Sequence, residues 1–212
     1  MKSVRHWTPT YILARIREIG YQRRNPDLPW LTQGANEFLS TYIRPSDVGL
    51  EFGSGRSTLW FAARVSRLVS VEHDRDWHKR ISASLADKAF GHVDYRYLAG
   101  DVNDPVAMEG AVQEITSQFN TGHFDFVLID GVYRDICTRE ALRIIRPGGI
   151  LIVDNVNRHL PSNSVSPGSR SLEMGPDGET WREIAEKIRT WRYVWTSSGV
   201  TDTAIFFKPE NA

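Results

Sequence analysis

The sequence predicts an α/β fold, a three-layer sandwich in which helices cover both faces of a mainly parallel, seven-stranded sheet with an antiparallel edge strand. Three observations predict it. Short runs rich in β-branched and aromatic residues alternate with amphipathic segments of helical length. Residues 124–129 are apolar almost throughout, which is typical of a strand buried on both faces. Five predicted strands end in small or acidic residues, and ligands of open α/β sheets bind outside such ends.

Length and composition favour one globular domain. Of 212 residues, 41% are hydrophobic and 25% are charged, which excludes disorder, collagen and coiled coil as the dominant class. The 26 basic residues balance the 26 acidic ones, so no global charge favours nucleic acid or an anionic membrane as a partner. The longest apolar run, 149–153, is too short to span a bilayer. We expect a cytoplasmic protein that binds a small molecule, without nucleic acid or membrane; a homodimer is left open.

The elements are expected in a regular order. Two helices, at 10–19 and 35–43, precede the first strand. Strands follow at 48–52, 68–71, 93–98, 124–129 and 150–153, and helices at 57–65, after Asp74, at 105–119 and at 133–145. A helix at 180–190 then leads to strands 191–196 and 203–207, which we expect to pair antiparallel at one sheet edge.

Two segments lie outside this alternation. Residues 156–179 form a long loop rich in Gly, Pro and Ser, for which we predict the role of a lid over the site. Residues 1–45 form an N-terminal helical segment on the substrate side, and residues 46–212 form the ligand-binding α/β domain. We expect these two parts to act effectively as one domain.

The end of the first strand carries a glycine turn. It reads Glu51-Phe52-Gly53-Ser54-Gly55 and stands between a strand and a helix. Gly53 and Gly55 can let the backbone bend tightly and approach a ligand, although a turn alone would also explain either glycine. Glu72 ends the second strand about twenty residues later, where a carboxylate can accept hydrogen bonds from the two hydroxyls of a ribose. Together these features predict an adenosine-containing ligand.

The residues after the turn bear on which adenosine ligand is bound. Ser57 and Thr58 occupy the region in which a dinucleotide-binding fold has its third glycine. This disfavours NAD.

The motifs together resemble the class I S-adenosylmethionine-dependent methyltransferases, which have a Rossmann-like fold. The matching segments are 51–55 for their first motif, 71–74 for the second, 99–101 for the acid after the third strand, 124–130 for the fourth strand and 146–151 for the turn into the fifth. The resemblance covers residues 30–154 closely and reaches about 207 through the terminal strand pair. Residues 1–29 and 156–179 lie outside it.

The resemblance implies S-adenosylmethionine as cofactor and a partner for each of its groups. Glu51 or Asp130 would face the ammonium and sulfonium, and the amides of residues 54–57 would face the carboxylate. Glu72 would bind the ribose and Asp101 the adenine amino group, although Asp101 can also be a turn or helix-capping residue. The full predicted set is Glu51, Gly53, Ser54, Gly55, Ser57, Thr58, Glu72, His73, Asp101 and Asp130.

A metal site is a further hypothesis. Asp130, Asp154 and Asn155 follow adjacent predicted strands, and their oxygens suit Mg²⁺. They resemble the metal site of catechol-type O-methyltransferases, in which a lysine three positions after the first aspartate assists deprotonation. Here Tyr133 takes that position and Arg134 follows; arginine cannot be a base but can bind an anionic substrate. The alternative assigns Asp130 to the donor site and residues 154–155 to a loop cap, so Mg²⁺ is a doubtful cofactor.

The predicted function is methyl transfer to a small-molecule acceptor, with O-methylation favoured. The expected catalytic residues are Asp130, Arg134 and His159; His159 is the best placed of three candidate bases because it lies beside the predicted lid. Two alternatives stay open: a dinucleotide-dependent oxidoreductase and a non-catalytic protein that binds an adenosyl ligand.

Overall fold

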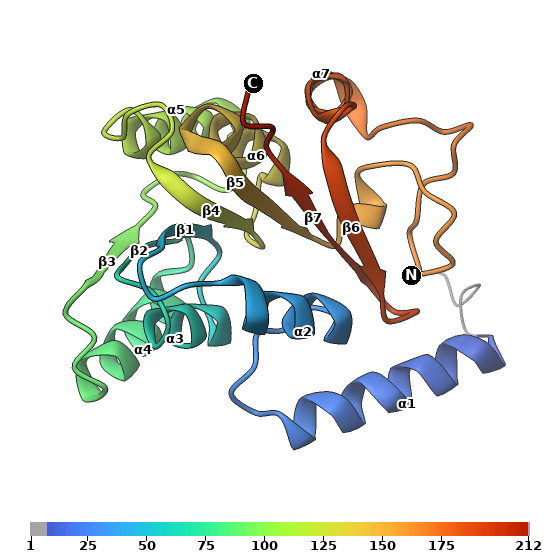
Figure 1. Cartoon of the computed structure of the whole chain (residues 1–212), viewed down its shortest axis with the longest axis horizontal. Coiled ribbons are helices and arrows are strands. Elements are labelled where there is room, and N and C mark those ends of the chain that lie inside the picture. The colour runs from blue at the N-terminus through green and yellow to red at the C-terminus, as the bar shows by residue number, and fades with distance from the viewer. Residues whose placement is uncertain (1–7, 212) are drawn as a thin grey trace.

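The chain folds around one seven-stranded sheet with helices on both faces (Figure 1). The computed structural model describes residues 8–211. Its strands are β1 (Val48–Phe52), β2 (Arg67–Glu72), β3 (Val93–Tyr97), β4 (Phe124–Ile129), β5 (Ile145–Asp154), β6 (Arg192–Ser197) and β7 (Asp202–Phe207). Its helices are α1 (Pro9–Arg24), α2 (Gln33–Tyr42), α3 (Arg56–Ala62), α4 (Arg75–Asp87), α5 (Pro105–Thr116), α6 (Arg134–Ile144) and α7 (Gly178–Ile188), with a 3₁₀ turn, η2 (Val156–Arg158).

The strand order is β3-β2-β1-β4-β5-β7-β6. The first five strands of the chain run parallel to one another, and β7 pairs antiparallel with both β5 and β6. The predicted fold class is therefore confirmed. The order reverses between β1 and β4, and in such sheets a ligand binds outside the carboxyl ends of the strands at that reversal.

Two cores hold the three layers together. Helices α5, α6 and α7 pack on one face of the sheet, and α2, α3 and α4 pack on the other (Figure 1). Strand β4 contributes to both, because Val127 and Ile129 belong to the first core and Phe126 and Leu128 to the second. All four side chains are fully buried, which confirms the prediction of a strand buried on both faces.

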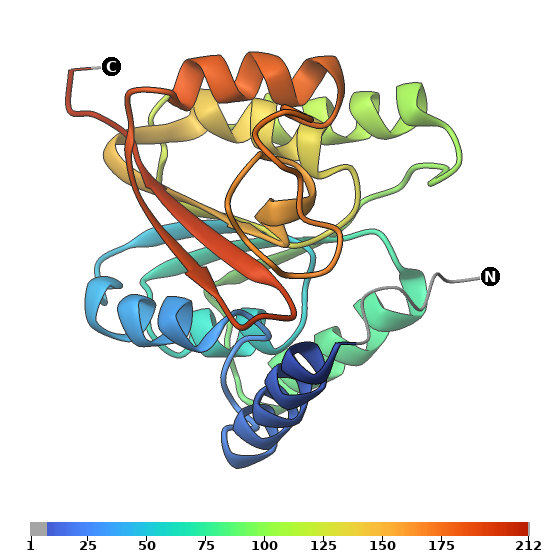
Figure 2. The same ribbon diagram turned by 90° about the vertical axis from the view of Figure 1, so that its right-hand side faces the viewer.

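Helix α1 does not fit the expected pattern of burial. The apolar residues whose spacing predicts this helix, Ile12, Leu13 and Ile16, are exposed, at 41%, 56% and 60% of full accessibility. No residue of α1 is buried. Its side chains accept from the rest of the fold at Glu18 Oε1, from Ser198 Oγ at 3.3 Å, and at the Tyr21 hydroxyl, from Asn36 Nδ2 at 3.5 Å. Figures 1 and 2 show α1 on the outer side of the α2–α4 layer. The periodicity predicted the helix correctly but not its packing, because α2–α4 already cover that face of the sheet.

Strand β5 is longer than predicted. The sequence places a turn at residues 147–149, but the strand already begins at Ile145. A register shift opposite Phe124 and Phe126 accommodates the additional residues. Gly148 lies at a φ of +72°, and its N–H donates to the Lys208 carbonyl oxygen, so pairing continues through the irregular segment.

The predicted lid is a folded segment. It contains η2 and is held to the sheet edge by Ser166 Oγ, which donates to Asp202 Oδ1 at 2.6 Å. Within the segment, the N–H of Arg170 donates to the carbonyl of Asn157 at 2.9 Å. The segment therefore lies along β6 and β7, and of its residues only His159 and Asp177 line a cavity near the end of β4. Within residues 8–211, none of the helices combines the length and apolar character that a membrane span requires.

Candidate active site

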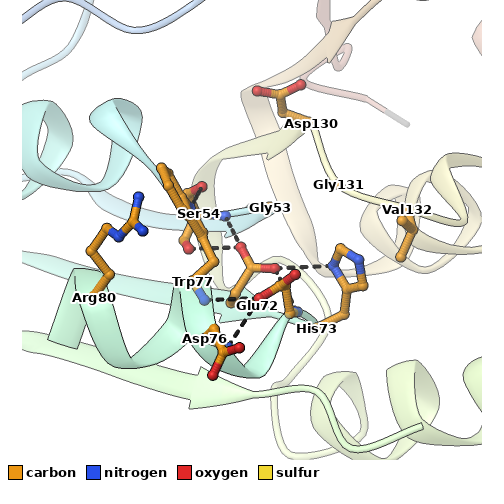
Figure 3. A pocket seen from close by; sticks show the side chains of 11 residues that line it. Gly53, Ser54, Glu72, His73, Asp76, Trp77, Arg80, Asp130, Gly131 and Val132 are labelled. Carbon is orange, nitrogen blue, oxygen red and sulfur yellow. Dashed lines mark hydrogen bonds and ion pairs between the residues drawn. The ribbon is translucent and has the colours of Figure 1, made fainter. Parts of the chain in front are cut away.

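Two adjoining cavities open at the carboxyl ends of β1, β2 and β4. The first, the strand-end cleft, has a volume of about 550 Å³ and includes Glu72, His73 and Gly131 in its lining (Figure 3). The second, the helix-side cavity, has a volume of about 340 Å³ and lies at the start of α3. Ser54, Trp77 and Asp130 line both, so the two cavities form one continuous site at the point where the strand order reverses.

The backbone conformation at position 53 requires a glycine. Its φ of +97° lies in the region that L-residues avoid, and an added Cβ would lie 2.5 Å from the N atom of Gly131. The close approach of the ends of β1 and β4 therefore explains this glycine. Gly55 differs, because its φ of 167° is ordinary extended backbone and a Cβ there would meet only Trp77, at 4.0 Å. The expectation that both glycines allow a tight bend is correct for Gly53 alone; Gly55 leaves space open in the helix-side cavity.

Glu72 lines the strand-end cleft, and each of its carboxylate oxygens has two partners. Oε2 accepts from the N–H and the hydroxyl of Ser54 at 3.0 and 2.7 Å. Oε1 accepts from the N–H of Asp74 at 2.8 Å and lies 3.0 Å from His73 Nδ1 (Figure 3). A carboxylate has about four acceptor positions, so Glu72 uses all of them inside the protein. A ribose at this position would have to replace a partner such as the Ser54 hydroxyl or the His73 ring.

Glu51 lies beneath the site and lines neither cavity. It is fully buried, its Oε1 accepts from Ser70 Oγ at 2.7 Å, and its Oε2 has no hydrogen-bond partner. Burial raises the pKa of Glu51 to about 7, and the neighbouring hydroxyls of Thr58 and Ser70 oppose the shift. Of the two carboxylates predicted to face the ammonium, only Asp130 lies at the cavity wall.

Of the remaining residues predicted to bind the methyl donor, Ser57 lines the site, whereas Thr58 and Asp101 do not. Ser57 lines the helix-side cavity, whereas the buried Thr58 uses its hydroxyl to accept from the N–H of Gly55 at 2.9 Å. Asp101 is exposed and lines neither cavity, and its Oδ1 accepts from the N–H and the amide of Asn103 at 2.9 and 3.0 Å. The structure thus shows Asp101 as a turn residue, and its contact with adenine stays a prediction.

Arg134 ties the ends of β4 and β5 together. Its Nε donates to the carbonyl of Gly131 at 3.0 Å, and its Nη2 donates to Asp130 Oδ1 at 3.0 Å. Its Nη1 donates to the carbonyl of Asp154. Every nitrogen of the guanidinium makes at least one of these bonds, so Arg134 fixes the strand ends; its binding of an anionic substrate stays a prediction.

The predicted metal trio is brought together, but it does not fit a divalent cation. Thr203 Oγ1 donates to Asp154 Oδ1 at 2.8 Å, and the amide of Asn155 donates to Asp154 Oδ2. The Arg134 guanidinium already supplies positive charge between the two carboxylates. Burial and the neighbouring Asp154 carboxyl raise the pKa of Asp130, which Arg134 opposes. Among residues 8–211, no cluster of three His, Cys, Asp or Glu side chains is placed to bind a metal.

A third cavity, the His159 cavity, lies beside the strand-end cleft and shares Gly131 with it. Its volume is about 310 Å³. The His159 ring stacks on Trp181 at 4.8 Å, and its Nδ1 lies 3.6 Å from Asp177 Oδ2, beyond hydrogen-bonding distance. Arg170 Nη1 holds the other oxygen of Asp177 at 2.9 Å. Burial, with a further contribution from Arg134, lowers the pKa of His159, and this shift favours the neutral form of the imidazole.

Trp77 is a site residue that the sequence analysis does not single out; it lies on the helix expected after Asp74. It lines both the strand-end cleft and the helix-side cavity, and its Nε1 donates to the carbonyl of Ser54 at 2.8 Å. The signal was its spacing: Asp74 caps α4, accepting from the N–H of Trp77 at 2.8 Å, so the indole lies in the first helical turn after β2. Trp30 and Arg56 also line the helix-side cavity.

The comparisons with known proteins agree with this geometry. Residues 50–156, half of the chain, match a family described as "Methyltransferase domain". No curated protein sequence matches the chain.

Solved structures share its fold at low sequence identity. A Staphylococcus aureus protein provisionally assigned as a caffeoyl-CoA O-methyltransferase superposes with a TM-score of 0.59 at 17% identity, covering 96% of this chain and 94% of that one. A methyltransferase from Geobacter sulfurreducens gives 0.54 at 13% identity, covering 92% and 88%. A SAM-dependent methyltransferase from Aquifex aeolicus gives 0.51 at 10% identity, covering 84% and 89%. On its family match, its fold and its motifs, the chain belongs to the class I S-adenosylmethionine-dependent methyltransferases.

Proposed function

We propose that this methyltransferase methylates a hydroxyl oxygen of a small-molecule acceptor. The observation that carries the proposal is the imidazole of His159, which lines a cavity that shares Gly131 with the strand-end cleft. A hydroxyl acceptor needs a proton acceptor, whereas many other acceptors do not. The fold shared with the Staphylococcus aureus protein, itself only provisionally assigned to O-methylation, is compatible with this acceptor chemistry.

The donor-side cavities fit S-adenosylmethionine. The indoles of Trp30 and Trp77 and the carboxylate of Asp130 offer aromatic faces and negative charge, which suit a sulfonium cation. The missing side chain of Gly55 leaves room beside them. Glu72, with Ser54 and His73 around it, offers polar partners for a diol. When bound, S-adenosylmethionine supplies an activated methyl group that a nucleophile can displace.

The residues of the His159 cavity can orient an acceptor and remove its proton. A ring nitrogen of His159 can accept the proton of the acceptor hydroxyl, and the Asp177 carboxylate, 3.6 Å from Nδ1, stabilises the imidazolium that forms by its charge. The Arg134 bonds fix the backbone at Gly131, which forms the wall between the two cavities. A volume of about 310 Å³ is at the small end of ligand sites, so it favours a small acceptor.

An acceptor screen tests the proposal. Phenols, alcohols, amines and thiols are incubated with S-adenosylmethionine, release of S-adenosylhomocysteine is measured, and the methylated atom is identified by mass spectrometry and NMR. We expect an O-methylated product and a large loss of turnover in His159→Gln with donor affinity retained. The matched control is His123→Gln, since His123 is exposed and lines none of these cavities. An N- or C-methylated product, or full turnover in His159→Gln, would contradict the proposal; donor binding without any turnover would favour the non-catalytic alternative.

A further inference from the structure

A separate pocket lies on the other side of Arg56 from the donor cavities. It has a volume of about 210 Å³, and we call it the Arg64 pocket. Its walls come from residues 26–28, one face of α3 and the chain just after α4. Leu28, Leu59 and Phe90 supply apolar surface.

The charge in the Arg64 pocket is unbalanced. Arg56, Arg64 and Lys88 line it together with a single carboxylate, Asp27. In the described part of the chain, none of the three cations forms an ion pair with a carboxylate. Burial lowers the pKa of Arg64, and no neighbouring anion opposes the shift. The pocket thus gathers positive charge that the fold itself does not neutralise.

Two hydrogen-bond donors of the lining residues are also without partners. Arg56 Nη1 and the indole Nε1 of Trp60 are buried, and neither has an acceptor within the described residues. Trp60 is only 3% exposed, and the Arg64 guanidinium lies 4.1 Å from its ring centroid while donating to the Trp60 carbonyl at 2.9 Å. Both atoms are enclosed by the surrounding protein, so a ligand in the pocket would meet the charged side chains of Arg64 and Lys88 rather than these two donors.

We propose that the Arg64 pocket binds a small ligand through an oxyanion of the phosphate type. Three cationic side chains around one small volume, Arg56, Arg64 and Lys88, are the chemistry that recognises tetrahedral oxyanions. The apolar walls leave room for a short carbon portion attached to the phosphate. The site is distinct from the donor site, although Arg56 lines both, and the inference does not depend on the identity of the methyl acceptor.

Calorimetric titration of the purified protein tests this proposal. The probes are inorganic phosphate, phenyl phosphate and, as an uncharged control, phenol. We expect the phosphate probes to bind and phenol not to bind. Tighter binding of phenyl phosphate than of inorganic phosphate would identify a phosphorylated small molecule as the ligand class, and equal binding would identify the free anion. Absence of binding by both phosphate probes would overturn the proposal.

Variants of the lining residues test whether phosphate binds in the Arg64 pocket. Arg64→Ala and Lys88→Ala should each weaken phosphate binding roughly tenfold or more, because a charge-assisted bond is lost. Arg189→Ala removes an exposed arginine on the distant α7 side and is the matched control, with unchanged affinity expected. Thermal unfolding verifies that each variant is folded. Binding that survives both cation variants, or that saturating S-adenosylhomocysteine abolishes, would place the anion elsewhere and overturn the inference.

Discussion

Relative to wild type, the Glu51→Gln protein should gain stability as the pH rises from acidic to alkaline values. Glu51 is fully buried, and one of its oxygens has no hydrogen-bond partner, so its negative charge is poorly compensated. Glutamine keeps the shape and the acceptor oxygen for Ser70 but carries no charge at any pH. The substitution therefore isolates the cost of ionising this carboxyl inside the fold.

The size of the effect follows from the pKa of Glu51, which burial raises from 4.5 to about 7. Below pH 4.5 the group is protonated in both the folded and the unfolded state and contributes no difference. Between pH 4.5 and 7 the unfolded chain releases the proton first, so the free energy of unfolding falls as pH rises. Above pH 7 the full difference is reached, about 3 kcal/mol. At pH 8 the variant should be more stable by about this amount, plus a pH-independent offset from the substitution.

Urea denaturation at pH 4.5, 6 and 8 measures this difference directly. For a chain of this length, 3 kcal/mol corresponds to roughly 6 to 12 °C in melting temperature, so thermal unfolding is a second measurement. Glu114→Gln, which alters an exposed carboxylate, is the control for general charge effects. If the free-energy difference between wild type and Glu51→Gln is the same at pH 4.5 and pH 8, the burial argument is wrong.

Four further predictions concern the site. Gly53→Ala should destabilise the protein by more than about 2 kcal/mol in denaturation, because of the positive φ and the clash with Gly131. Gly55→Ala should retain stability but weaken donor binding in calorimetry. Glu72→Ala should weaken donor binding roughly ten- to a hundredfold in calorimetry, and an unchanged affinity would remove Glu72 from the site. Chelators should leave turnover unchanged, and a loss restored by Mg²⁺ would show that Arg134 yields to a metal. Turnover should fall at acidic pH with an apparent pKa below the usual 6.5 of histidine, and the same profile in His159→Gln would refute its role as base.

The fold was predictable because its signals are local and periodic. β1 and β4 have the predicted bounds, since an apolar run flanked by turn residues determines a strand with little help from the rest of the chain. The extension of β5 was not predictable, because it depends on pairing with Lys208, which is distant in sequence. Composition predicted a lid over the site at 156–179, but long-range bonds such as the one from Ser166 to Asp202 fold that segment onto the sheet edge.

The candidate site was predictable in position but only partly in detail. Strand ends placed Gly53, Glu72 and Asp130 at one edge, and all three line the cleft. Sequence spacing could not show that Glu51 points into the core or that Arg134 occupies the space between two carboxylates. These outcomes depend on side-chain direction and on contacts between β4, β5 and α6. Single-domain behaviour, the oligomeric state and the partners stay predictions.

Helix α1 has a thermodynamic consequence of its own. A helix with no fully buried side chain gains little from tertiary packing, and α1, with 16 residues, is only slightly longer than the isolated helices of up to about 12–15 residues that are marginal in water. Its opening therefore costs far less free energy than global unfolding, and it forms a separate cooperative unit within the fold. Its amide hydrogens should exchange with solvent almost as fast as those of the free peptide, while those of β1 and β4 exchange only when the whole sheet opens. Proteolysis within α1 should accordingly leave the unfolding transition of the sheet where it was.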